Sequence, residues 1–116
     1  MIAIIFEVTP AEGRKEAYLE IAARLREDLE QIEGFISVER FQSLTNPEKM
    51  LSISFFENED AVTTWRNTQA HRRAQAQGRK GVFADYHLRV AQVLRDYEMN
   101  ERDQAPCDSQ EAHGST

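Results

Sequence analysis

The spacing of apolar residues along this chain switches between two periods, and the order of the switches limits the possible folds more than any other feature. Four stretches have the alternating or continuous apolar pattern of a β-strand, and two longer stretches have the three- and four-residue spacing of an amphipathic helix. The predicted order is therefore strand, helix, strand, strand, helix, strand. The strands are expected at residues 2–8, 35–44, 50–57 and 85–97, and the helices between residues 10 and 34 and from residue 58 to 78.

The first predicted helix carries start and stop signals. Thr9 is a suitable N-cap, Pro10 suits the first helical position, and Glu12 completes a capping box. The helix would bury one stripe of residues: Tyr18, Ile21, Ala22, Leu25, Leu29 and Ile32. Gly34 is expected at the C′ position that ends it.

The second predicted helix is expected to be interrupted. Asn58 is a suitable N-cap for its first piece. Asn67 and Thr68 favour a break, after which Thr68 would cap a second piece that ends at Gly78.

The strands predict both the fold and an oligomer. The alternation of the second strand slips, which predicts a bulge near Glu39 and Arg40. The element order is that of the split βαβ, or ferredoxin-like, α+β fold with a four-stranded antiparallel sheet. Two helices cover only one face of such a sheet, yet Phe55 and Phe56 put apolar side chains on both faces. We therefore expect a homodimer in which two sheets pack into a dimeric α+β barrel.

Composition excludes several classes of function. The formal net charge of −6 argues against general binding to nucleic acid or to anionic membranes. The lone Cys107 rules out an intrachain disulfide, and the three histidines lack the spacing of a metal site. Met1 leads directly into a strand, which predicts a cytoplasmic protein without a signal peptide. We expect a folded domain over residues 1–98 and a polar C-terminal tail over residues 99–116.

One segment, residues 65–80, is unlike the rest of this acidic chain. It contains the only Trp, Trp65, and a histidine, His71. No Asp or Glu occurs between Ala61 and Ala84, whereas five basic residues do: Arg66, Arg72, Arg73, Arg79 and Lys80. Two interpretations stay open: a solvated face that pairs with the acidic first helix, which is the commoner case, and the mouth of a site for an anionic ligand.

Several stretches of the chain resemble the antibiotic biosynthesis monooxygenase (ABM) family. The resemblance covers roughly residues 1–97 and rests on residues 34–41, 51–56, 65–72, 78–86 and 89–90. It implies the same ferredoxin-like fold. It also implies one of several activities, because the family includes enzymes that oxidise aromatic polyketides to quinones without a cofactor, haem-degrading enzymes, and members with no assigned reaction.

The residues that act in the family match this chain only in part. Quinone-forming members use an Asn and a Trp on the second helix and a Tyr six positions after the Trp. Here Trp65 keeps the Trp, His71 stands at the Tyr position, and Ala61 stands at the Asn position. Haem-degrading members use an Asn on the first strand and a His ten positions after the Trp, where this chain has Phe6 and Gln75.

The resemblance therefore implies a cofactor-independent monooxygenase that oxidises a small aromatic or phenolic, polyketide- or quinol-like, substrate with O2, and no cofactor is expected. His71 is the candidate proton acceptor, and Trp65 and Tyr86 are further catalytic candidates. The predicted substrate-binding residues are Phe55 and Phe56 as aromatic walls and Arg40 and Arg89 as partners of a phenolate.

Each candidate also has a structural interpretation. Trp65 could belong to the core or an interface, His71 to a helix cap or the surface, and Arg40 and Arg89 to inter-strand ion pairs. Two other functions stay open as well: a haem-binding or haem-degrading protein of the same fold, and a non-catalytic small-molecule-binding stress-response module.

Overall fold

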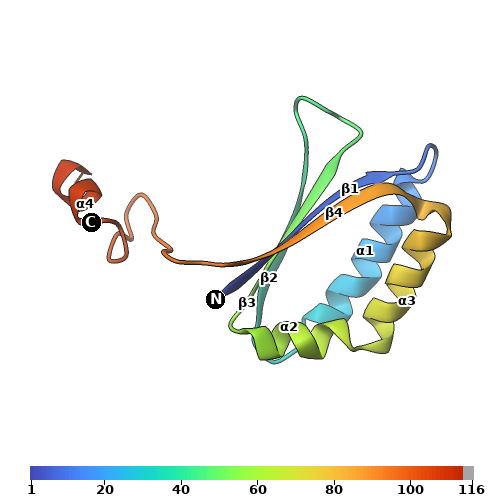
Figure 1. The fold of residues 1–116 in the computed structure, drawn as a ribbon, viewed down its shortest axis with the longest axis horizontal. Helices are drawn as coiled ribbons and strands as arrows, with labels where there is room; N and C mark the ends of the chain where they lie inside the picture. The colour runs from blue at the N-terminus through green and yellow to red at the C-terminus, as the bar shows by residue number, and fades with distance from the viewer. Residues whose placement is uncertain (114–116) are drawn as a thin grey trace.

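A computed structural model describes residues 1–113 of the chain. The elements, in order, are β1 Ile2–Pro10, α1 Lys15–Leu29, β2 Phe35–Gln42, β3 Met50–Phe56, α2 Glu59–Arg66, α3 Gln69–Gln77, a π-helical turn η1 Gly78–Val82, β4 Phe83–Gln92 and α4 Cys107–His113. The strands form one antiparallel sheet in the order β2-β3-β1-β4. Helices α1, α2 and α3 lie on one side of it (Figure 1). The predicted ferredoxin-like α+β fold is therefore confirmed.

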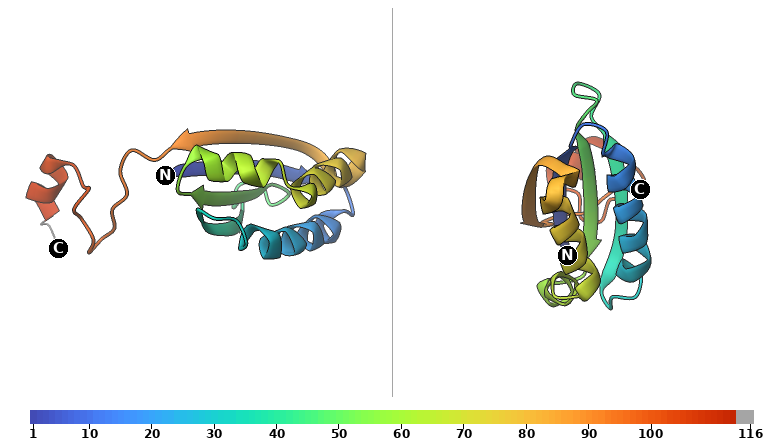
Figure 2. Two further views of the ribbon diagram at one scale, coloured as in Figure 1. Left: turned by 90° about the horizontal axis from the view of Figure 1, so that it is seen from below. Right: turned by 90° about the vertical axis from the view of Figure 1, so that its right-hand side faces the viewer.

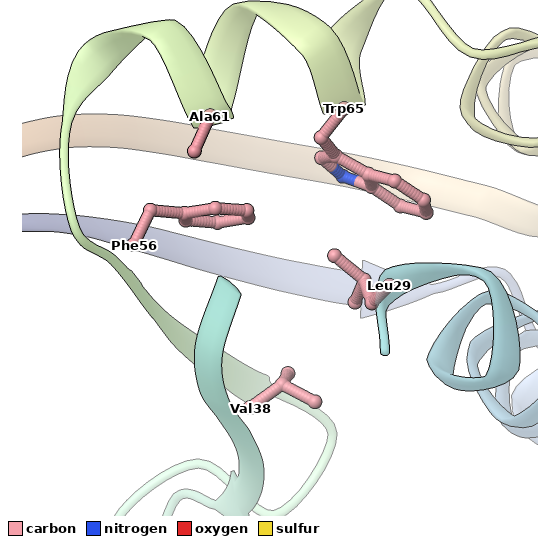
Figure 3. Packing of buried hydrophobic residues seen from close by; sticks show 5 residues of the cluster. All are labelled: Leu29, Val38, Phe56, Ala61 and Trp65. Carbon is pink, nitrogen blue, oxygen red and sulfur yellow. The ribbon is translucent and has the colours of Figure 1, made fainter. Parts of the chain in front are cut away.

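Two clusters of buried side chains join the helices to the sheet. The first joins Leu29 of α1, Val38, Phe56, and Ala61 and Trp65 of α2. Figure 3 shows Ala61 and Trp65 reaching from α2 toward Phe56 and Leu29. The second cluster contains Val8, Tyr18, Met50 and Val82. Phe56 is only 1% exposed, so replacing it with Ala should destabilise the fold by about 3–5 kcal/mol.

The predicted start of the first helix is wrong. Thr9 and Pro10 extend β1 and pair with β4, and α1 begins at Lys15 after a turn through Gly13, which has a φ of 75°. Arg14 is the N-cap and makes no side-chain capping bond. Local capping signals were overridden because pairing with β4 continues through Thr9, and Pro10 lies at the bulge that ends the strand, where its missing N–H costs little.

The predicted stripe of α1 is confirmed, but the helix ends earlier than expected. Tyr18, Ala22 and Leu29 are buried, and the last helical residue is Leu29. Gly34 is therefore not the C′ residue. It has a φ of 90° and lies where a Cβ would come 2.9 Å from the Cβ of Ala61, so it serves the close approach of α2 to the turn before β2.

Two strand details also differ from the prediction. The β2 bulge lies between Phe35 and Ser37 rather than near Glu39 and Arg40. The last strand spans Phe83–Gln92 rather than residues 85–97, because its partner β1 begins at Ile2 and offers nothing further to pair with. The backbone N–H of Val93 donates to the carbonyl of Met1 beyond the end of the strand.

The broken second helix is confirmed at both caps. Asn58 Oδ1 accepts a hydrogen bond from the N–H of Ala61 at 2.9 Å, and Thr68 Oγ1 accepts one from the N–H of His71 at 3.1 Å. The break falls between Arg66 and Gln69. It changes the direction of the chain, so that α3 runs beside α1 (Figures 1 and 2).

After β4 the chain leaves the sheet and ends in α4, which lies away from the three-helix layer (Figure 1). This segment holds itself together. The Arg102 guanidinium lies 5.3 Å from the centre of the Tyr97 ring and donates to Ser109 Oγ. Gln110 Nε2 donates to the carbonyl of Ala105 at 2.8 Å. Within residues 1–113, no helix is long and apolar enough to cross a membrane.

Candidate functional site

A cavity of about 160 Å³ lies between the sheet and the helices. The aliphatic part of its lining comprises Ile4, Ile21, Ala22, Leu25, Leu29, Val38, Ala74 and Leu88. The aromatic and polar part comprises Phe6, Tyr18, Trp65, His71, Phe83, Tyr86, Arg40, Ser52, Ser54, Gln75 and Arg79. Tyr86 and Leu88 are 42% and 47% exposed, so the cavity opens to solvent along β4. A mostly apolar cavity with a few polar side chains is typical of a small-molecule site.

The structure brings four of the seven predicted site residues to this cavity. Trp65, His71, Tyr86 and Arg40 line it. Because neighbouring strand residues point to opposite faces, Phe55 and Arg89 project from the open face of the sheet, away from the helices. Phe56 faces the helices but is enclosed in the first core cluster and does not line the cavity.

Arg89 makes the inter-strand ion pair that was one of its two interpretations. Its Nη1 lies 3.0 Å from Glu7 Oε2, and Lys49 Nζ lies 3.6 Å from Glu7 Oε1. The hydrogen bond from Arg89 and the charge of Lys49 lower the pKa of the Glu7 carboxyl. Of the two arginines predicted to pair with a phenolate, Arg40 lines the cavity and Arg89 does not.

His71 is held in a defined orientation at the cavity. The break in the helix puts it in the first turn of α3, where Thr68 caps its N–H. Its Nδ1 lies 3.2 Å from the carbonyl oxygen of Arg66, and because a carbonyl only accepts, Nδ1 carries the proton in the neutral ring. The Trp65 ring lies edge-on to it, at 5.3 Å between ring centres.

Burial lowers the pKa of His71, and the charges of Arg66 and Arg72 lower it further, while the hydrogen bond to the Arg66 carbonyl partly opposes the shift. The imidazole is thus neutral near pH 7, and its Nε2 lone pair is available as a base. Trp65 is 8% exposed within the core cluster and also lines the cavity, so it has a structural place in the core and a surface at the cavity.

Two functional candidates in the cavity were missed from the sequence. Arg79 Nη2 donates to Tyr86 Oη at 3.0 Å and fixes the phenol at the cavity mouth. Tyr18 of α1, which was assigned only to the core stripe, lines the cavity and packs edge-on against Phe83, with 5.9 Å between ring centres. A tyrosine within an otherwise aliphatic stripe was the available signal for Tyr18. Membership in the acid-free segment was the signal for Arg79.

The basic segment does not pair with the acidic face of α1. Among the described residues, no ion pair joins them. Arg72 donates to Asn67 Oδ1 at 2.8 Å, and Arg73 is 3.4 Å from the carbonyl of Gln69. The commoner of the two interpretations of this segment therefore lacks its expected contacts.

The sequence comparisons agree with this geometry. Residues 1–77 match the family model described as "Antibiotic biosynthesis monooxygenase". The chain belongs to this family. It is 46% identical over 101 residues to the jasmonate monooxygenase ABM of Pyricularia oryzae, a match that covers 87% of this chain but 47% of that protein. The chain thus spans about half the length of that relative. It is also 29% identical over 93 residues to YqjZ of Bacillus subtilis, covering 80% of this chain and 79% of YqjZ.

Solved structures of low sequence identity share the fold. A protein from Mycobacterium tuberculosis has a TM-score of 0.75 at 13% identity, covering 84% of this chain and 98% of that one. A variant of SnoaB, a cofactor-independent oxygenase from Streptomyces nogalater, has a TM-score of 0.72 at 10% identity, covering 82% of this chain and 94% of SnoaB.

Two residues that the resemblance sets against working residues of haem-degrading members lie at the cavity of this ABM domain. Phe6 and Gln75, which stand at the Asn and His positions of haem-degrading members, both line the cavity. Neither side chain is a usual ligand of haem iron. At the Asn position of quinone-forming members, Ala61 is buried in the core cluster and does not line the cavity.

Proposed function

We propose that the chain is a cofactor-independent monooxygenase that oxidises a small aromatic or phenolic, polyketide- or quinol-like, substrate with O2. One observation carries this proposal: a neutral His71, with Nδ1 committed to the Arg66 carbonyl, lines an apolar cavity beside Trp65. A base with a fixed tautomer beside apolar and aromatic side chains suits the activation of a phenol.

The proposed reaction balances without an external reductant. His71 Nε2 takes the phenolic proton, and the phenolate transfers one electron to O2. The resulting radical pair forms a carbon–oxygen bond to give a peroxide. The peroxide anion takes the proton back from His71, and water is then lost as the O–O bond breaks and the same ring carbon gives up its hydrogen, so that this carbon becomes a quinone carbonyl. One O2 is consumed, and one of its oxygen atoms enters the quinone while the other leaves as water.

The rest of the cavity suits these steps. Trp65 and Tyr86 supply aromatic surface for a planar substrate, and the Tyr86 hydroxyl, which accepts from Arg79, keeps its own O–H available as a donor. Arg40 supplies a positive charge toward negative oxygen.

The experiment is incubation of the protein with anthrone or a dihydroxynaphthalene under ¹⁸O2, following the quinone and its isotope content. His71→Ala should lower turnover by about 10²–10⁴, the usual contribution of a positioned general base. His87→Ala is the matched control, because His87 lies on the open face of the sheet beside Arg89. Equal turnover in the wild-type and His71→Ala proteins would remove the catalytic role of His71.

A second candidate follows from the similarity to the jasmonate monooxygenase of Pyricularia oryzae. The same cavity would then oxidise a jasmonate-type carboxylic acid. Hydroxylation of an aliphatic carbon by O2 takes up two electrons and two protons in addition, so it needs a reductant of the reduced nicotinamide or flavin class as co-substrate. Incubation with jasmonate and O2, with and without reduced nicotinamide, distinguishes this candidate from phenol oxidation.

A further inference from the structure

Two polar groups at the cavity are incompletely hydrogen-bonded. The Tyr18 hydroxyl and Arg40 Nε are enclosed, and neither forms a hydrogen bond of good geometry with a described residue, although the side chains of Tyr18 and Arg40 lie close enough to interact with each other. Tyr18 is only 4% exposed. An unsatisfied buried polar group costs about 1–3 kcal/mol, and more when it is charged, so such groups are rare unless a ligand completes them.

The charge of Arg40 is also uncompensated within the cavity. Arg40 and Arg79 are the formally charged residues of the lining, and the lining contains no Asp or Glu. Across the sheet, Arg40 pairs with Ser52, which pairs with Phe6, which pairs with Leu88, so its row carries no carboxylate. A guanidinium does not lose its proton, so its charge needs an anion from elsewhere.

Arg89 provides the contrast within the same sheet. It also lies on a strand, but on the open face, and Glu7 supplies its carboxylate at 3.0 Å. The protein thus completes Arg89 with a carboxylate of its own and leaves Arg40, beside an apolar cavity, without one among the described residues.

We infer that Arg40 and Tyr18 form the binding seat for the carboxylate of a small, apolar organic acid whose hydrocarbon body fills the cavity toward Trp65 and His71. A guanidinium matches a carboxylate in shape and charge, and the tyrosine O–H can donate to one of its oxygens. The inference rests on the proposed function in one respect, that this acid is the substrate.

The group is a carboxylate rather than a simple phenolate because of ionisation. A carboxylic acid is fully charged near pH 7, whereas an ordinary phenol is not. Burial raises the pKa of Tyr18, and the charge of Arg40 and its side-chain interaction with the Tyr18 oxygen only partly oppose this, so Tyr18 stays protonated as a donor. The seat then holds the acid, and His71 acts on another part of the molecule.

The test compares 3-phenylpropionate with its neutral isostere 3-phenylpropanamide. Binding is followed by calorimetry and by the fluorescence of Trp65, the only Trp of the chain. The wild-type protein should bind the acid at least tenfold more tightly than the amide. Arg40→Gln should weaken binding of the acid by about 10- to 100-fold and leave binding of the amide unchanged. Tyr18→Phe should weaken binding of the acid several-fold, and Arg40→Lys should retain part of the preference for the acid over the amide.

Arg26→Gln is the control for total charge, because Arg26 is exposed on α1 and paired with Glu30. Equal wild-type affinity for acid and amide, no detectable acid binding, or an acid preference that survives Arg40→Gln would each overturn the inference. If Arg40→Gln does not fold, the inference is still tested by the affinities of the wild-type protein for acid and amide and by the Arg40→Lys variant. The binding assay does not depend on turnover, so the two hypotheses can fail separately. If the protein prefers the acid through Arg40 but oxidises no phenol, only the proposed function is excluded. If it oxidises the phenol but shows no Arg40-dependent preference for the acid, only the carboxylate site is excluded.

Discussion

At the scale of single residues, the proposed chemistry of the cavity depends on which ring nitrogen of His71 carries the proton. Nδ1 faces the Arg66 carbonyl, which leaves Nε2 as the basic atom. The neighbouring Trp65 is shared between the core and the cavity, so its replacement would alter packing as well as any ligand contact. His71 is not part of a core cluster, and its backbone N–H bonds to Thr68 whatever its side chain, so it is the better residue for testing function.

The pH dependence of His71 has a defined sign. Because burial lowers its pKa below 6.5, the unfolded chain binds more protons than the folded chain between the two pKa values. Stability should therefore fall as pH drops below 6.5 and level off once the pH is below the folded pKa. The acid limb of kcat/KM should likewise lie below pH 6.5.

Urea unfolding between pH 7 and pH 5 measures the first effect, and steady-state kinetics measures the second. His71→Gln should remove this contribution to the pH dependence of stability, whereas His87→Gln should keep it. An acid limb above pH 6.5 would show that His71 is not held neutral as its surroundings indicate.

At the scale of elements, the break between α2 and α3 is what delivers His71 to the cavity. Thr68 serves it twice, because its Oγ1 accepts from the N–H of His71 and donates to the carbonyl of Trp65 at 2.9 Å. A continuous helix would carry the residue six positions after Trp65 to a different side of the axis.

Thr68→Ala should therefore affect both stability and activity. The expected loss of unfolding free energy is about 1 kcal/mol, as for other N-caps, and turnover should fall in addition because the His71 ring loses its fixed position. Asn58→Ala removes the matching cap of α2 and should cost similar stability with little effect on turnover. Thermal melts measure the stability of both variants, and rate assays made side by side measure their turnover. The prediction fails if the two variants lose turnover equally.

At the scale of the whole molecule, the face of the sheet opposite the helices needs a cover. Ile5, Leu51, Ile53 and Phe55 project from it. We propose that a second copy of the chain covers this face, because single domains rarely leave such a patch to solvent.

The wild-type protein should sediment as a homodimer at micromolar concentration. Ile53→Lys places a charge in the middle of the proposed interface and should shift the equilibrium toward monomer by at least tenfold in the dissociation constant. Lys49→Glu is a charge change at the rim and should matter less. A wild-type protein that sediments as a stable, folded monomer would exclude the dimer.

The C-terminal segment is expected to be dispensable for the fold. Among the described residues, its hydrogen bonds include those from Gln110 Nε2 to the carbonyls of Arg102 and Ala105 and one from the N–H of Asp96, just after β4, to Gln104 Oε1. Deleting residues 101–116 should change the free energy of unfolding by less than about 0.5 kcal/mol. Chemical unfolding of the shortened chain measures this, and a loss of several kcal/mol would show that the segment docks elsewhere, most simply on a second copy.

Local signals in the sequence determined those parts of the protein that depend on neighbouring residues. The order of elements, the α1 stripe and the caps at Asn58 and Thr68 follow from periodicity and from side chains three residues away from the N–H groups they bind. Trp65 and His71 could be singled out for the same reason, as unusual residues in an unusual segment.

Only the tertiary structure decided what depends on strand pairing. Pairing with β4 extended β1 past its capping signals, and register placed Arg40 at the cavity but Arg89 beside Glu7 on the other face. Tyr18 comes close enough to interact with Arg40 because α1 packs across the sheet, which no local pattern encodes. The sequence alone could not separate the two arginines, because a shift of one residue in register reverses the face of every side chain on a strand.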